Sequence, residues 1–125
     1  MDSWIHDKKR MTVPERFTSI KGNNDLLQQV IDQLNKDVHG FMNEFKWEDA
    51  EDAYQNFVVA VEKEVKAISR NQLMQVLYRI DISEQKMRLI WTLEEENQNT
   101  KITQLILDRE LQKVLTRLAY KNRNN

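Results

Sequence analysis

The strongest pattern of hydrophobic positions in the chain lies in residues 102–121, where apolar residues recur at helical spacing. At about 100° per residue, one stripe roughly 100° wide collects Leu107, Leu111, Val114, Leu115 and Leu118. Ile102, Leu105 and Ile106 point to the other side, so the first two turns are apolar nearly all round. The pattern predicts a final helix with a central front half and a peripheral back half, around which the other elements pack.

Two long amphipathic helices are predicted before it, over residues 25–45 and 48–68. On one continuous helix their apolar stripes would lie about 160° apart, so a break is needed near residues 43–47. A short connection there favours an antiparallel pair. We expect Asn24 or Asp25 to cap the first helix, and acidic residues to complement the dipole at the start of the second. These acidic residues are Glu48, Asp49, Glu51 and Asp52.

Two shorter helices follow, over residues 72–80 and 83–93. Ser69 or Asn71 is expected to cap the first, and Ser83 the second, because a serine or asparagine oxygen accepts from the free amides of a first turn. The polar residues 94–100 predict a loop, with Thr100 capping the final helix. The chain therefore contains about five helices.

The composition supports this class of fold. The chain has 125 residues, only two glycines and one proline, which favours helix over sheet and one domain over two. We expect an all-α fold, a compact bundle of about five mostly antiparallel helices. Residues 1–22 are interpreted as an N-terminal arm in which Pro14 begins a short helix, residues 23–121 as a single helical domain, and residues 122–125 as a frayed tail.

The inventory of catalytic groups is thin. There is no cysteine, no glycine-rich phosphate loop and no Gly-x-Ser-x-Gly motif. His6 and His39 lack a partner at metal-binding spacing. The N-terminal residues lack an apolar signal region, and the sequence contains no apolar run of membrane-spanning length. We expect a cytoplasmic protein that is not an enzyme, with no metal, no cofactor and no membrane association.

The charge is unevenly distributed although the formal net charge is −1. Residues 23–68 carry four basic and ten acidic groups, whereas residues 69–125 carry ten basic and seven acidic groups. One interpretation is that the acidic middle and the basic end face each other across the fold. The other is that the basic end offers a surface to an anionic partner.

The sharpest functional feature is a basic edge beside the apolar stripe of the final helix. It consists of Arg109, Lys113, Arg117 and Lys121 at four-residue spacing. Cations also stabilise a helix C-terminus, and Glu110 lies one turn from Lys113 and partly neutralises it. Trp4 in the arm either packs on the bundle or is offered to a second chain. The first hypothesis is a non-enzymatic helical protein interaction module, which binds an unknown partner or itself.

The alternative is a small DNA-binding regulator. Residues 73–90 place Val76, Ile80, Ile82, Met87 and Ile90 at the apolar positions of a helix-turn-helix unit. Over about 20 residues the segment resembles that motif. It departs from the motif at Leu77, where a small residue is usual, and at Asp81, where a glycine is usual. The resemblance implies nucleic-acid contacts from Gln85, Lys86 and Arg88.

One observation separates the two hypotheses. Burial of both Leu89 and Trp91 would exclude an exposed recognition helix, whereas Leu89 exposed beside Lys86 and Arg88 keeps it open. We expect no nucleic-acid binding, because the chain has no net positive charge.

Overall fold

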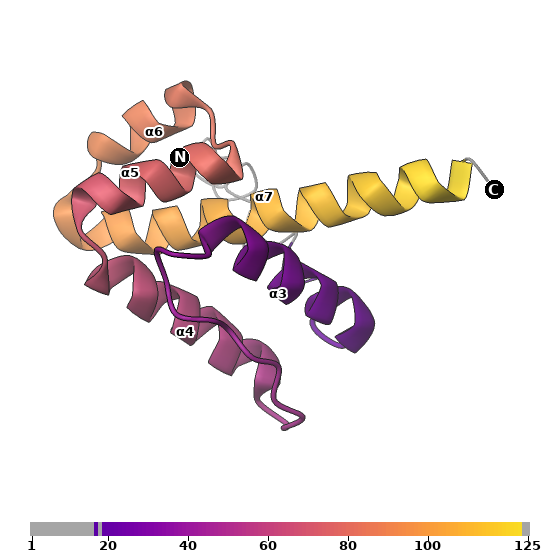
Figure 1. Cartoon of the computed structure of the whole chain (residues 1–125). Coiled ribbons are helices and arrows are strands. Elements are labelled where there is room, and N and C mark those ends of the chain that lie inside the picture. The colour runs from indigo at the N-terminus through magenta and orange to yellow at the C-terminus, as the bar shows by residue number, and fades with distance from the viewer. Residues whose placement is uncertain (1–16, 18, 124–125) are drawn as a thin grey trace, which may run out of the picture.

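A computed structural model describes Phe17 and residues 19–123, and these residues form five helices and no strand (Figure 1). The helices are α3 (Asn24–Val38), α4 (Ala53–Ala67), α5 (Arg70–Ile80), α6 (Glu84–Trp91) and α7 (Glu95–Arg123). The predicted all-α class is confirmed. Of the predicted arm, Phe17 and residues 19–22 are described, and Phe17 and Ile20 are buried. Trp4 lies outside the described residues.

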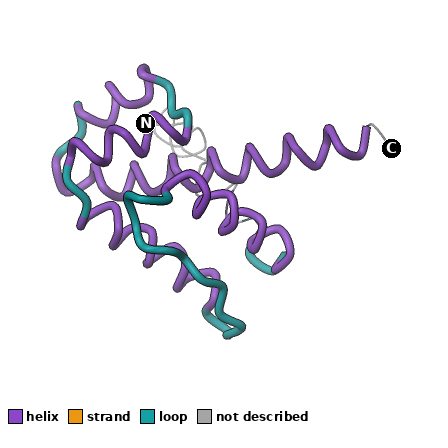
Figure 2. Tube along the Cα trace, in the orientation of Figure 1, coloured by secondary structure: helices purple, strands orange, loops and turns teal. Residues whose placement is uncertain are grey.

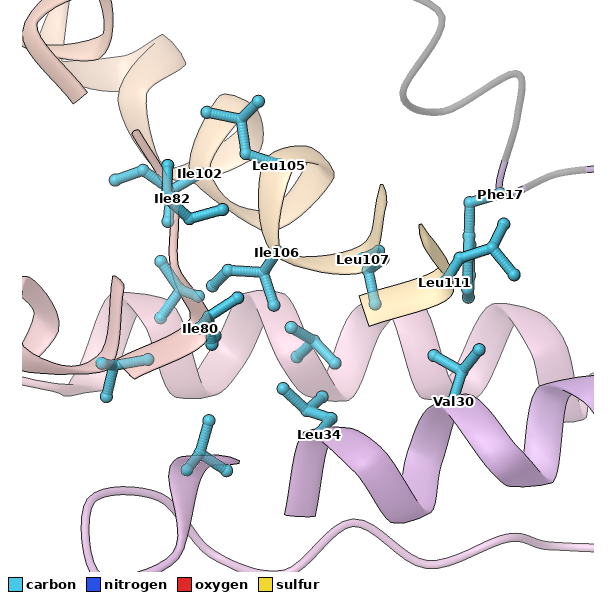
Figure 3. Close-up of a cluster of buried hydrophobic side chains, with 14 of the residues drawn as sticks. Phe17, Val30, Leu34, Ile80, Ile82, Ile102, Leu105, Ile106, Leu107 and Leu111 are labelled. Atoms are coloured by element: carbon cyan, nitrogen blue, oxygen red, sulfur yellow. The ribbon is translucent and has the colours of Figure 1, made fainter. Parts of the chain in front are cut away.

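α7 is the helix on which the others pack. It contacts α3, α4, α5 and α6, and its N-terminal half lies inside the bundle (Figure 1). The all-round apolar turns of the sequence are the reason, because Ile102, Leu105 and Ile106 are each buried. Figure 3 shows α7 side chains gathered with Val30 and Leu34 of α3 and with Ile80 of α5. The prediction of a central front half is confirmed.

The connection between α3 and α4 differs from the prediction. α3 ends at Val38 rather than near residue 45, and residues 39–52 form a long loop (teal in Figure 2). Gly40 leaves the helix at φ 89°, a left-handed conformation that other residues rarely adopt. The Asn35 side chain then pairs with the backbone of Phe45, accepting from its N–H at 2.7 Å and donating to its carbonyl at 2.8 Å. This pairing holds the segment extended.

The extended segment runs back along α4, so the two long helices are not an antiparallel pair. Asn43 contacts Glu64 near the end of α4, with its backbone N–H donating to Oε1 at 3.0 Å. The loop reaches Ala53 only after passing along the helix, and α3 and α4 therefore run in the same direction (Figure 1). Phe41, Met42 and Phe45 continue the helical spacing of α3 in the sequence, but they lie in a turn and an extended segment, where Phe45 is buried and the other two are partly buried.

The helix starts agree with the sequence in part. The side chains of Ser69 and Ser83 accept from the amides of Gln72 and Lys86, as predicted. At α3 the cap is Asn23 rather than Asn24 or Asp25. α7 begins at Glu95, so the predicted loop over residues 94–100 is wrong. Polar residues form a stable first turn there, because two glutamates complement the helix dipole.

The far end of α7 extends past the bundle. The helix continues to Arg123, beyond the predicted end at residue 121, and its C-terminal half projects from the other helices (Figure 1). Leu111 and Val114 are buried, but Leu115 on the same stripe is 42% exposed. All three lie on the predicted apolar stripe, but Leu115 is exposed at the edge of the core, while Leu118, further along the helix, is partly buried against it. None of the described helices is long and apolar enough to cross a membrane.

We predict that Leu111→Ala lowers the free energy of unfolding by about 2–5 kcal/mol, because it leaves a cavity in the core. Leu115→Ala, the matched control on the same helix face, should cost less than about 1 kcal/mol. Urea unfolding of both variants measures the difference. Equal losses at the two positions would show that the core extends to Leu115.

Candidate functional site

The projecting half of α7 carries an apolar stripe beyond the edge of the core. Leu115 is exposed and Leu118 is partly buried, and both lie on the face that Leu111 and Val114 bury further back. Apolar residues on one continuous helix face are typical of a surface that packs against another element. Leu118 still packs against the edge of the core, so among the described residues of the stripe it is Leu115 that lies exposed.

The basic edge of α7 is divided between two roles. Arg109 forms an ion pair with Asp81 at 3.1 Å, Lys113 with Asp37 at 2.7 Å, and Arg117 Nη1 donates to Gln33 Oε1 at 2.8 Å. These three cations tie α7 to the turn after α5 and to α3. Lys121 lies on the projecting half and is exposed. The partner surface predicted from the edge remains a prediction, and its outer end offers Lys121 with the exposed Arg117.

A buried acid lies where α7 meets α3. The Glu110 side chain is fully buried, and its Oε1 lies 3.5 Å from Lys113 Nζ, as the spacing of the two residues predicts. With Glu110 ionised, no described donor is in hydrogen-bond geometry with either of its carboxylate oxygens. The protonated acid, in contrast, can donate to Asp37.

Burial raises the pKa of Glu110 to about 8, and the neighbouring Asp37 carboxylate acts in the same direction. Lys113 opposes both effects without overcoming them. Burial would also raise the pKa of Asp37, but hydrogen bonds with Glu110 and Lys113 outweigh it and lower that pKa. One proton on Glu110 therefore lets the two carboxyls share the interface at neutral pH.

The face predicted for nucleic-acid contacts lies on α6. Gln85, Lys86 and Arg88 are exposed, and Leu89 beside them is 61% exposed. The turn between α5 and α6 contains Asp81 at φ 74°, a conformation that the motif usually gives to glycine. The observation that would have excluded an exposed recognition helix is therefore not met. Arg88, however, is paired with Glu84 at 3.7 Å.

Acidic residues surround this face. Glu94, Glu95 and Glu96 follow α6 directly and are exposed. On the basic side, Lys101 adds a charge, and its pKa is lowered by burial and by the nearby charge of Lys86. Trp91, at the end of α6, is partly buried beneath the guanidinium of Arg70, which lies 4.1 Å from the ring centroid. The α6 face thus combines basic, acidic and apolar groups.

A groove on the α4 side was not predicted. It has a volume of about 350 Å³ and lies between the extended loop and α4, with Phe45, Trp47 and Phe57 among its lining residues. The acidic residues expected in the first turn of α4 lie in the loop before it, because α4 begins at Ala53. The sequence showed that these acidic residues are clustered, but not that they lie beside a groove. The groove itself depends on the long-range pairing of Asn35 with Phe45.

The expectation that acidic middle and basic end face each other holds only in part. Asp37 pairs with Lys113, but the acidic loop before α4 and the end of α7 lie at separate ends of the molecule (Figure 1).

The described residues include no group of three or more histidines and acids placed to hold a metal ion. Comparison of the chain with known protein families, curated proteins and solved structures gives no match.

We predict that Glu110→Gln changes the pH dependence of stability. The pKa of Glu110 in the fold lies above its ordinary value of 4.5, so its stabilising effect is complete below about pH 4.5 and is lost as the pH rises through about 8. Glutamine stays neutral and keeps the shape. The free energy of unfolding of the variant should therefore exceed that of the wild type by a few kcal/mol near pH 9, since one pKa unit corresponds to about 1.4 kcal/mol.

Urea unfolding between about pH 5 and pH 9 measures this difference. The control is Glu84→Gln, because that side chain is 80% exposed and its neutralisation should leave the pH dependence unchanged. If wild type and Glu110→Gln lose stability in parallel as the pH rises, Glu110 is already ionised in the folded protein and the assignment is wrong.

Proposed function

We propose that this protein is a non-enzymatic interaction module that docks another protein chain through the projecting half of α7. The observation that carries the proposal is the apolar stripe of α7, which continues from buried Leu111 to exposed Leu115. Apolar helix faces that pack into a groove of a second chain use anchors at this spacing. The exposed cations Arg117 and Lys121 flank the stripe and add a charged margin.

The rest of the molecule supports this use of α7. Four other helices contact α7, and Arg109, Lys113 and, nearer its C-terminal end, Arg117 link it to the turn after α5 and to α3. A rigidly held helix loses little conformational freedom when a partner binds its free end, which favours affinity. Trp4, the other residue expected to contact a partner, remains a prediction.

We predict that a photoreactive residue at position 115 cross-links in living cells to one discrete protein, because Leu115 would lie inside the docked surface. The matched control is position 89 on α6, where Leu89 is also exposed. The mass of the adduct distinguishes a second 15.0 kDa copy of this chain from a different protein. No adduct at position 115, or equal adducts at both positions, would contradict the proposal.

The second candidate, a DNA-binding regulator using α6, is supported by the exposure of Leu89 among Gln85, Lys86 and Arg88. The charges nearby oppose it. Arg88 is paired with Glu84, and three consecutive glutamates from Glu94 to Glu96 would repel a phosphate backbone. We therefore place it behind the interaction module.

For this candidate we predict no complex with mixed DNA duplexes at about 50 mM salt, where phosphate contacts are strongest. Fluorescence anisotropy with labelled duplexes measures the affinity. A complex of micromolar or higher affinity would favour the regulator, and loss of its sequence preference in Arg88→Ala would locate it on α6.

A further inference from the structure

The groove beside α4 is built as a receptor for apolar side chains. Phe45 and Phe57 meet edge to face with ring centroids 5.9 Å apart, and Trp47 continues the aromatic wall. Ala53 and Ala60 of α4 line the same groove, and their small side chains leave it open. A volume of about 350 Å³ suits a few protruding side chains rather than a whole helix.

The loop that forms the groove is held on both sides. Asn35 of α3 makes two hydrogen bonds with the backbone of Phe45. Glu64 of α4 accepts from the backbone N–H of Asn43 at 3.0 Å and from its side-chain amide at 3.3 Å. The groove is therefore present before any partner arrives, and binding does not require the loop to become ordered.

The margin of the groove is strongly acidic. Residues 43–53 contain five acidic residues and one basic residue. All five acids are exposed, namely Glu44, Glu48, Asp49, Glu51 and Asp52. Glu44 and Glu48 line the groove itself, together with Glu64, Lys46 and Lys63, and the other three acids lie in the adjoining loop that leads into α4.

The projecting half of α7 has the opposite character. Residues 115–123 contain three basic residues and no acidic residue. Two copies of this helix end would therefore repel each other if they paired side by side, which argues against a symmetric contact between the two ends. The helix end is complementary in charge to the margin of the groove.

We propose that the projecting half of α7 of one copy docks against the α4 groove of a second copy. This inference rests on the proposed function and names the partner as the chain itself. The exposed Leu115 would enter the aromatic groove, while the exposed Arg117 and Lys121 would meet its acidic margin. Within the described part of one molecule the two surfaces lie apart and do not meet each other (Figure 1).

The net charge of the chain is compatible with this association. A formal net charge of −1 gives little long-range repulsion between copies. The interface is heterologous, because two different surfaces meet. Two copies that exchange their helix ends reciprocally form a closed dimer, whereas one-way docking produces longer chains. In both arrangements, association should weaken with salt, since exposed charges are screened within about 3 Å at 1 M.

Charge reversal tests the inference by sedimentation at several protein concentrations. The helix variant is Arg117→Glu with Lys121→Glu, and the groove variant is Glu48→Lys with Glu51→Lys. All four side chains are exposed. We expect the wild type to self-associate, each variant alone to associate at least about tenfold more weakly, and an equimolar mixture of the two to associate again, because each then meets an opposite charge. Circular dichroism checks that every variant keeps its helix content.

A matched control reverses two exposed cations on α6, Lys86→Glu with Arg88→Glu, and should associate as the wild type does. A monomeric wild type at all concentrations, unaltered association of either variant, or a mixture that stays monomeric would each overturn the inference. These results leave the proposed function standing if position 115 still cross-links to a different protein. Absence of any adduct at position 115 would contradict both the proposed function and this inference.

Discussion

Burial of the front half of α7 is the constraint on which the other helices depend. Four helices contact α7, and the apolar side chains Ile102, Leu105 and Ile106 of its front half are all buried. Hydrophobic burial is the dominant favourable contribution to folding, so a helix that is apolar on nearly every side gains most when it is surrounded. The positions of α3 and α4 follow from this, since each packs extensively against α7.

The same burial explains the unusual chemistry at the α3–α7 contact. An acid at position 110 is fully enclosed beside Asp37, and of the cations in the described part of the chain the Lys113 ammonium lies close to both carboxyls. A carboxyl in such a place remains neutral to a higher pH, because removing an ion from water costs more than the nearby cation returns. The stable form of the contact therefore has a neutral Glu110, an ionised Asp37 and a charged Lys113 rather than three ions.

Local sequence signals predicted the features that local physics determines. The helical class, the central half of α7 and the caps at Ser69 and Ser83 follow from spacing and side-chain chemistry within a few residues. The path of residues 39–52 did not follow, because it depends on Asn35 reaching a backbone ten residues away. The groove beside α4 could not be predicted from the sequence, because it depends on the same long-range contact. The pattern predicted a peripheral back half of α7, but the exposure of Leu115 beside the partly buried Leu118 depends on which helices lie next to it and was beyond local signals.

The central claim is that one continuous helix is buried in its first half and available for docking in its second. Amide hydrogen exchange, followed residue by residue at low protein concentration, tests it most directly. The account predicts that amides of residues 102–114 exchange only when the whole protein unfolds, and that those of residues 116–122 exchange much faster through local opening. Uniform protection along α7 from residue 102 to residue 122 in the monomer would contradict the account.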